Sequence, residues 1–542
     1  MRPARKSTLF LLVLASSVLL PLALPNDLFA GFARFLGLKP GESLFWGDSV
    51  LGLVAIAPVF YAVSRAPSFR FASLLGAVFG AVSTAISSFW LMYFQGFSVW
   101  TYGGTILGYT GYNSLLFPFL LAFSRKGDRF RPLLLAAAWT LYEYFKSVGF
   151  LGYPWGLISH PVGGFLPLIQ VVDVTGVLGL SFLMALINAL VAEYALVGPR
   201  RLYVRQAAFG LFLVVCVLGY GVYRLATPIP HATTASLLLV QQNMNPWNEG
   251  QGKEESFQAN AALTLSAIRS MPKPPDLAVW SESSVTNVGV NLDRSYYPAK
   301  NNLVKAIQAG GVPVLFGGYV IVDLRKQLLM NGAILADANG TVLDTYGKIH
   351  PVPFAESIPF FEVPWVGAFF RNVVGIWLPW VSGARFTTFK VPLQAGGELA
   401  FGVPICFEDA FGNLCRGYIN HGADMFVNIT NDSWSKTWSA EIQHFVTARF
   451  RAVENRRVLV RSTNSGVSAV VGPWGELLTK LPYFEPTSRA IDVPVYKEKG
   501  PTIYTRFGDW FAYALMVVLF AVLAIDVLPK KRRLPLESSL LS

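Results

Sequence analysis

Long apolar runs constrain the fold of this chain more than any other feature of its sequence. A helix needs about 20 apolar residues to cross the hydrocarbon core of a bilayer. Hydrophobic residues make up 53% of the 542 positions and charged residues only 14%, more apolar surface than a soluble protein of this size needs. We therefore expect a polytopic α-helical membrane domain. Its eight or so transmembrane helices are expected at residues 7–25, 48–64, 71–94, 103–124, 132–148, 174–198, 206–223 and 509–528.

Basic residues between the apolar runs predict how the chain is oriented. Cytoplasmic loops of membrane proteins carry an excess of Lys and Arg. Connections 95–102 and 149–173 contain neither residue, and they alternate along the chain with basic segments. The basic segments are 65–70, 125–131, 199–205 and 530–533. We expect both termini in the cytoplasm, so the net charge of +12 reflects topology and needs no nucleic-acid partner.

Three features of the membrane half need separate interpretation. The first run follows three basic residues, as a signal peptide would, but its length and the later runs favour a retained anchor. A patch at 28–38 carries Arg34 and is too short to cross, so we expect a loop or an interfacial helix. Glu143 lies within an apolar run, where a charge is costly. We expect it to pair with Lys146, one turn away.

The apolar runs divide the chain into three predicted parts. Residues 1–224 form a membrane domain with seven transmembrane helices, and 508–542 form a last transmembrane helix with a basic cytoplasmic tail. Because seven crossings precede it, the part at 225–507 is expected outside the cytoplasm.

Residues 225–507 read as an α/β domain, because short β-rich runs alternate with helical stretches. Strands are expected at 235–244, 276–284, 312–320, 331–340, 399–408, 423–432, 458–466 and 467–477. Helices are expected at 254–271, 300–310, 410–421 and 438–455. Polar residues follow several of these strands, which is where open α/β sheets usually place their ligands.

Three of these polar residues make chemical sense together. Glu282, Lys348 and Cys406 taken singly have ordinary structural roles: a cap, a surface lysine and a small buried hydrophobe. As a set they supply a base, an electrophile and a nucleophile for acyl transfer. A nearby ammonium lowers a thiol's pKa and stabilises an oxyanion, and a carboxylate carries the proton.

Cys406 also has a second cysteine nearby in the sequence, Cys415. Outside the cytoplasm disulfides persist, so a bridge between the two is one interpretation. A bridge would block the attacking sulfur. Cys415 falls in the predicted helix at 410–421, with no base or ammonium assigned to it. We therefore interpret the pair as one nucleophile and one bystander.

Several motifs together resemble a known family. "WSES" (280–283), "GKIHPVPFAE" (347–356) and "ICFE" (405–408) occur in the order typical of the nitrilase, or carbon–nitrogen hydrolase, superfamily. "NITNDSW" (428–434) and the membrane-half stretch "WTLYEYFKSVGFLGYPWG" (139–156) are similar to the membrane branch, the apolipoprotein N-acyltransferase family. The resemblance implies that the outer domain is a nitrilase-like α-β-β-α sandwich.

The resemblance also implies roles for individual residues. It makes Glu282 the general base, Lys348 the oxyanion stabiliser and Cys406 the nucleophile. The supporting or substrate-binding residues that it implies are Glu356, Phe407, Glu408, Trp247 and Trp434. Two positions depart from the family pattern: Ser281 stands where Pro is usual, and Ala355 where Gly is usual. These departures affect local geometry and remove no reacting group.

The implied reaction is transfer of a fatty acyl chain in two steps through a Cys406 thioester. The donor is a phospholipid, typically the sn-1 chain of phosphatidylethanolamine. The acceptor is the α-amino group of the N-terminal S-diacylglyceryl cysteine of an apolipoprotein. The resemblance places the enzyme in the bacterial inner membrane, with its catalytic domain on the periplasmic side. We expect a monomer without a metal or organic cofactor.

An aromatic-rich segment at 358–381 follows the lysine motif. Because the segment contains Arg371 and Asn372, we do not expect it to form a ninth transmembrane helix. Aromatic rings favour the membrane interface, so we interpret the segment as a lid that admits acyl chains; the alternative is an ordinary core segment. A membrane-tethered amidase, with water as acceptor, remains an alternative function, as does an inactive lipid-binding scaffold.

Overall fold

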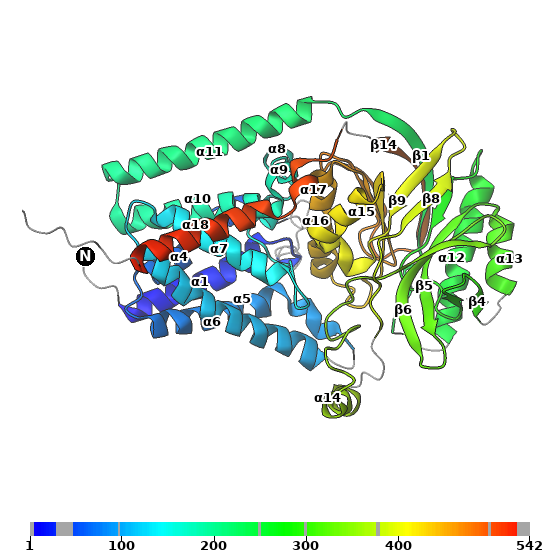
Figure 1. Cartoon of the computed structure of the whole chain (residues 1–542), viewed down its shortest axis with the longest axis horizontal. Helices are drawn as coiled ribbons and strands as arrows, with labels where there is room; N and C mark the ends of the chain where they lie inside the picture. Colours follow the sequence, from blue (N-terminus) through cyan, green and yellow to red (C-terminus); the bar gives the residue numbers. More distant parts are fainter. Residues whose placement is uncertain are drawn as a thin grey trace, which may run out of the picture.

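The structure is a computed structural model of the chain, and it describes residues 5–28, 47–95, 98–247, 251–297, 301–374, 380–496 and 500–527. Nearly all of the patch predicted at 28–38, and the basic tail after 527, lie outside the described residues. A helical bundle forms one end of the molecule and two β-sheets form the other (Figure 1).

The bundle contains a helix in each of the eight predicted apolar runs. They are α1 (Lys6–Ala23), α4 (Ala57–Ser64), α5 (Phe69–Ser87), α6 (Gly104–Ser124), α7 (Arg131–Ser147), α10 (Val177–Val197), α11 (Arg201–Ala226) and α18 (Trp510–Val527). Five helical stretches are long and apolar enough to cross a membrane by length and composition: α1, α5, Val99–Ser124, α10 and α11. A membrane domain is therefore supported.

Short elements complete this part of the chain. They are α3 (Ser49–Gly52), η2 (Phe89–Tyr93), η3 (Val99–Gly103), η4 (His160–Val162), α8 (Leu166–Ile169) and α9 (Val172–Thr175). Helix α11 runs apart from the bundle in Figure 1, and only 6% of its apolar window is buried against protein. Its exposed leucine, phenylalanine and valine side chains need an apolar solvent such as lipid.

The predicted Glu143–Lys146 pair takes a different form. Glu143 Oε1 accepts hydrogen bonds from Trp139 Nε1 at 3.0 Å and from the Ile158 amide at 2.8 Å. Lys146 Nζ donates to the Trp155 carbonyl at 2.7 Å. Each buried polar group thus binds the connection that follows α7 instead of its neighbour on the helix. The prediction that Glu143 pairs with Lys146 was based on their spacing along the helix. That spacing does not reveal that the connection after α7 folds back onto the helix.

The first sheet of the α/β domain has eight strands: six in the order β14-β1-β2-β5-β3-β4, with β6 paired to β5 and β7 paired to β6. Their bounds are β1 His231–Gln241, β2 Leu277–Val279, β3 Gly289–Asn291, β4 Tyr296–Tyr297, β5 Val314–Asp323, β6 Leu328–Ala336, β7 Val342–Gly347 and β14 Thr487–Tyr496. Strands β1, β2, β5 and β3 are parallel, and β14 runs antiparallel to β1.

The second sheet has six strands in the order β13-β12-β11-β10-β9-β8. Their bounds are β8 Thr388–Pro392, β9 Glu398–Gly402, β10 Met425–Thr430, β11 Leu459–Thr463, β12 Ala469–Val471 and β13 Leu477–Lys480. Strands β9, β10 and β11 are parallel. The carboxyl ends of parallel strands therefore meet at one edge in each sheet.

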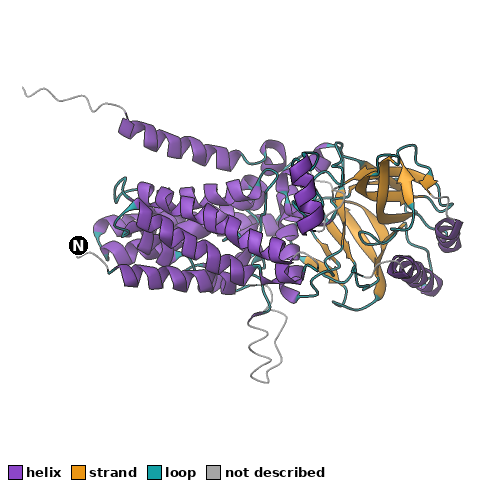
Figure 2. Ribbon diagram, turned by 90° about the horizontal axis from the view of Figure 1, so that it is seen from below, coloured by secondary structure: helices purple, strands orange, loops and turns teal. Residues whose placement is uncertain are grey.

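The two sheets pack face to face and helices cover their outer faces. Ser462 Oγ on β11 donates to the Val240 and Val279 carbonyls of the first sheet, at 3.2 and 3.0 Å. Helices α12 (Gln251–Ser270) and α13 (Asn301–Gly310) lie on the far side of the first sheet. Helices α15 (Gly412–Asn420) and α16 (Trp438–Asn455) lie between the second sheet and the bundle (Figures 1 and 2). This is the α-β-β-α sandwich that the resemblance implied.

Several strand predictions were too long or incomplete. The run at 399–408 leaves the sheet at Gly402, because the chain there turns into the short helix η6 (Cys406–Ala410). The run at 276–284 keeps only Leu277–Val279 as a strand. Strand β14 was missed, although it pairs with β1 over ten residues from His231 to Gln241. Its first four residues, TSRA, are polar or small, and Pro494 interrupts its apolar half, so periodicity alone does not separate it from a loop.

Candidate active site

Cys406 begins η6, directly after the second sheet, in a backbone conformation that few non-glycine residues adopt. Its φ is +50°, and such strain persists only where the surroundings fix it. The fixing group is Glu408, a fully buried carboxylate. It accepts the Ile405 amide at 2.8 Å and, across the domain, the Ile349 and His350 amides at 2.7 and 2.9 Å. Glu408 thereby ties the Cys406 turn to the segment that carries Lys348.

Glu282 follows strand β2 and points into the same edge. Its Oε1 accepts Asn331 Nδ2 at 2.7 Å, and its Oε2 accepts the Asn431 amide at 2.9 Å. Gly317 on the neighbouring strand makes this possible, because a Cβ there would lie 2.6 Å from the Glu282 Cα. Glu282 is only 5% exposed. The carboxylate is therefore fixed in direction before any substrate arrives.

Lys348 follows strand β7 and lies between two carboxylates. Its Nζ is 3.4 Å from Glu282 Oε1 and 2.8 Å from Glu356 Oε2. Asn331 Nδ2 also donates to Glu356, at 2.8 Å. The lysine side chain is 1% exposed. A buried ammonium is stable only when paired in this way.

The charges act on one another across the site. Burial raises the pKa of Glu282, and Lys348 opposes that rise only in part. Burial lowers the pKa of Lys348, but Glu356 and Glu282 raise it well above its usual value. Burial and the charge of Glu282 raise the pKa of the Cys406 thiol well above its usual value, although Lys348 lowers it.

The sequence led us to expect that a nearby ammonium would lower the pKa of the thiol; Lys348 does so, but burial and Glu282 outweigh it. With a raised thiol pKa, Cys406 rests as a neutral thiol, and its proton must leave during attack. Glu282 lies within hydrogen-bonding reach of the thiol, which lowers the carboxyl's pKa. A carboxylate with a raised pKa is a suitable base near neutral pH. The arrangement therefore offers a base, a nucleophile and a fixed positive charge at one point.

Phe407 and two tryptophans join the site to the bundle. Phe407 stacks on Trp155 of the membrane half at a centroid distance of 5.4 Å. Trp434 packs against Phe94 at 4.8 Å, and Trp247 packs against Phe94 at 5.3 Å. Trp247 Nε1 also donates to the Trp434 carbonyl at 3.0 Å. These aromatic residues lie where catalytic and membrane parts meet.

The two departures from the family pattern are accommodated locally. Ser281 is buried, and its hydroxyl donates to Gln242 Oε1 at 2.9 Å. In the 351–357 loop the positive φ, +61°, falls on Phe354 and leaves Ala355 in an ordinary conformation. Glu356 keeps its contacts with Lys348 and with the Val352 amide, the latter at 2.7 Å.

Cys406 and Cys415 are both free, as the interpretation of one nucleophile and one bystander requires. Cys415 is buried in α15, and burial raises the pKa of its thiol well above the usual value. A buried neutral thiol is a poor nucleophile.

Sequence reasoning missed a buried charged cluster next to Cys406. His444 on α16 binds Asp432 Oδ1 through Nδ1 at 2.9 Å and Asp409 Oδ1 through Nε2 at 2.8 Å. Arg461 on β11 pairs with both aspartates. Burial lowers the pKa of His444, but the two aspartates raise it to about 9. The cluster joins η6 to the end of β10. The sequence did contain a signal for this cluster, because its charged residues stand in otherwise apolar runs.

Asn331, which bridges Glu282 and Glu356, was also missed. An asparagine near the end of a predicted strand gives no sequence signal for that role. Among the residues that the structure describes, no three His, Cys, Asp or Glu side chains are grouped as a metal site would require.

Comparison with known proteins identifies both halves of the chain. The model for the apolipoprotein N-acyltransferase N-terminal domain matches residues 28–190, and the model for carbon-nitrogen hydrolase matches residues 239–497. Among solved structures, the comparison also finds the Nesterenkonia sp. amidase crystal structure. The two chains are 15% identical with a TM-score of 0.34, over 53% of this chain and 98% of that one.

Curated relatives match almost the whole chain. "Apolipoprotein N-acyltransferase 2" of Treponema denticola is 38% identical, over 97% of this chain and 98% of the relative. "Apolipoprotein N-acyltransferase" of Borreliella burgdorferi is 31% identical, over 98% of each. These names favour acyl transfer over the amidase alternative. The resemblance is confirmed at full length, and this chain belongs to the apolipoprotein N-acyltransferase family.

Proposed function

We propose that this enzyme transfers a fatty acyl chain from a phospholipid to the α-amino group of an S-diacylglyceryl cysteine at the N-terminus of an apolipoprotein. The donor is the sn-1 chain of phosphatidylethanolamine. The observation that most supports this proposal is the convergence of Glu282, Lys348 and Cys406 in one buried site beside the membrane half. A family made of the same two halves supports it further.

In the first step the Cys406 sulfur attacks the carbonyl carbon of the ester. Glu282 takes the thiol proton as the new carbon–sulfur bond forms. Lys348 stabilises the negative oxygen of the tetrahedral intermediate, an effect typically worth several kcal/mol. The intermediate breaks its carbon–oxygen bond, and Glu282 returns the proton to the leaving oxygen. The products are a thioester on Cys406 and a lysophospholipid.

In the second step the acceptor amine attacks the thioester. Glu282 takes a proton from the attacking nitrogen, and Lys348 again faces the negative oxygen. The carbon–sulfur bond breaks, an amide forms, and the thiol regains its proton from Glu282. Glu356 is a positioning residue, because it holds Lys348 at 2.8 Å from the side opposite Glu282.

The membrane half suits two lipid substrates. All eight apolar helices cross the inner membrane in this proposal, both termini are cytoplasmic, and residues 225–507 lie in the periplasm. Trp247, Trp434 and Phe407 line the approach from the bilayer. This placement puts the acyl ester within reach of Cys406 without extraction of the lipid into water.

The segment at 358–381 acts as the lid. Its described part contains α14 (Pro364–Phe369) and η5 (Phe370–Val374) and projects from the body in Figure 1; residues 375–379 lie outside the described residues. Phe360 is 70% and Trp365 75% exposed. Phe369 packs edge-on against Trp100 of the bundle at 5.6 Å. Large exposed rings next to a membrane helix favour insertion at the interface.

The test is the intact mass of the purified enzyme after incubation with phosphatidylethanolamine. We expect an adduct of one acyl chain on the wild type and none on Cys406→Ala. Addition of a diacylglyceryl-cysteine peptide should discharge the adduct and yield the N-acylated peptide. A wild-type protein that turns over short amides but never forms the adduct would contradict the proposal.

A further inference from the structure

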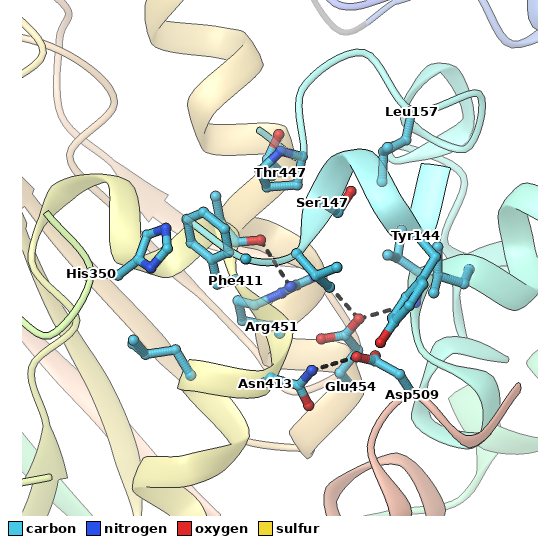
Figure 3. Close-up of a pocket in the computed structure, with 18 of the residues that line it drawn as sticks. Tyr144, Ser147, Leu157, His350, Phe411, Asn413, Thr447, Arg451, Glu454 and Asp509 are labelled. Atoms are coloured by element: carbon cyan, nitrogen blue, oxygen red, sulfur yellow. Dashed lines mark hydrogen bonds and ion pairs between the residues drawn. The ribbon is translucent and has the colours of Figure 1, made fainter. Parts of the chain in front are cut away.

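A second cavity lies between the catalytic domain and the bundle, apart from the triad. Its volume is about 360 Å³, within the range of roughly 300–1,000 Å³ that small-molecule sites occupy. The end of α7 and the start of α10 line one side, and α15, α16 and Asp509 line the other (Figure 3). None of Glu282, Lys348 and Cys406 is among the described residues that line it.

Polar groups gather at one end of this cavity. Arg451 Nη2 donates to Glu454 Oε1 at 3.0 Å, and the Val177 amide donates to the same oxygen at 3.1 Å. Asn413 Nδ2 binds Asp509 (Figure 3). Gly412 leaves the space open, because a Cβ there would lie 2.2 Å from the Tyr504 hydroxyl and 3.2 Å from Glu454 Oε2.

Glu454 is the strongest sign of a missing ligand. Its side chain is fully buried, and Oε2 has no hydrogen-bond partner among the described residues. Leaving a buried carboxylate oxygen unpaired is costly. Burial raises the pKa of Glu454 to about 7, and Arg451 opposes that rise only in part. A cation seated beside Oε2 would remove both penalties.

Within the lining of the cavity, carboxylates outnumber cations. Glu454 and Asp509 face one lining guanidinium, Arg451, and the Arg416 guanidinium acts on Asp509 from outside the lining. The lining also contains Tyr144, Tyr504, His160 and His350, and burial lowers the pKa of both histidines, so neither adds a positive charge near pH 7. A primary ammonium carries one positive charge and three donors, and so matches an unpaired oxygen and a second carboxylate.

Much of the remaining lining is apolar. Leu157 and Leu178 are buried, at 1% and 6% exposed, and Val148 also lines the cavity. Phe150, another lining residue, is 39% exposed. The cavity therefore offers apolar contacts as well as the Glu454 carboxylate.

We propose that this cavity binds the primary ammonium head of an amphiphile, with the ammonium at Glu454 and Asp509 and the apolar part toward Leu157. The site is separate from the triad and does not depend on its chemistry. Two amphiphiles offer this head group to such an enzyme: a phosphatidylethanolamine and a lipidated peptide with a free α-amine.

The test is photoaffinity labelling of the full-length enzyme in nanodiscs of phosphatidylglycerol, which has no amine. The probe is dodecyl phosphoethanolamine with a diazirine in its chain, and its N-acetyl derivative is the comparison. We expect the ammonium probe to label peptides from residues 144–160. Labelling should fall about tenfold or more with the N-acetyl probe, as for loss of a charge-assisted hydrogen bond.

Three variants complete the design. Glu454→Gln and Asp509→Asn should each reduce labelling severalfold, whereas Glu255→Gln, on the exposed side of α12, should not. Thermal midpoints check that each variant is folded. If Glu454→Gln unfolds, Asp509→Asn still tests the site, because Asp509 is partly exposed and its replacement disturbs the fold less. Competition by unlabelled phosphatidylethanolamine or by a diacylglyceryl-cysteine dipeptide identifies the natural source. Equal labelling by the N-acetyl probe, insensitivity to both carboxyl variants, or competition by neither compound would overturn the proposal.

Discussion

Replacing Lys348 with methionine separates its structural role from its catalytic one. The ammonium is 1% exposed and lies 3.4 Å from Glu282 and 2.8 Å from Glu356. Methionine has a similar length but no charge, so two carboxylates would share a buried space without a cation. Breaking a buried ion pair in this way typically costs about 3–5 kcal/mol. We expect a lower thermal midpoint and loss of Cys406 acylation by about 10²–10³-fold, as for removal of an oxyanion donor.

The loss of stability should depend on pH in a defined direction. Without the ammonium, one of the two carboxyls has a folded-state pKa above its unfolded value. Its protonated form is then favoured in the folded protein, so stability is greatest at low pH and falls as pH rises through that folded pKa. Thermal midpoints of Lys348→Met should therefore differ from the wild type less at about pH 5 than at about pH 8.

The double variant Lys348→Met, Glu356→Gln is the control. Glutamine removes one negative charge and still accepts the Val352 amide that binds Glu356 at 2.7 Å. We expect most of the lost stability to return and acylation to stay absent. Acylation by intact mass, followed over time, is the assay. A double variant that regains both stability and acylation would show that Lys348 acts only through folding, and a near-normal rate in Lys348→Met would remove it from the mechanism.

Other predictions test the remaining features. Cys415→Ser should lower the free-thiol count of the unreduced protein by one and leave acylation intact; an unreduced wild type that lacks two thiols would contradict the free pair. Burial raises the pKa of Glu408 to about 7, so stability from this group is present at low pH and is lost as pH rises through about 7. Glu408→Gln should flatten that fall in the thermal midpoint, and an unchanged slope would refute the assignment. Trp365→Ser should slow acyl transfer from vesicles several-fold but spare a soluble short-chain ester; equal effects on both would argue against a lid.

Much of the fold could be predicted because its signals are local. A run of some 20 apolar residues has few alternatives to a membrane helix, and all eight predicted runs contain a helix. Helices α12, α13, α15 and α16 were predicted within a few residues of their bounds. Strand ends were less accurate. Strand β9 ends at Gly402, and the turn that follows it and carries Cys406 is held by Glu408, which accepts three backbone amides from two segments.

The chemistry of the site depends both on the sequence and on the tertiary structure. Residue types at Glu282, Lys348 and Cys406 specify which groups can react, and motif order indicated the family. What sequence could not provide was the environment of those groups. The sequence indicated an ammonium that lowers the pKa of the thiol, but in the folded protein burial and Glu282 raise that pKa more than Lys348 lowers it. Electrostatic energies depend on distance and burial, and neither is encoded in spacing along the chain.

The sequence by itself indicated the membrane half, the α/β half, the family and the candidate reacting groups, because apolar length and residue identity are properties of the chain alone. Only the tertiary structure decided which groups the buried polar side chains contact. Glu143 binds the connection after α7, Asn331 bridges two carboxylates, and Glu454 faces a cavity shared by both halves. A buried polar group must find a hydrogen-bond partner, but folding decides which distant segment supplies it.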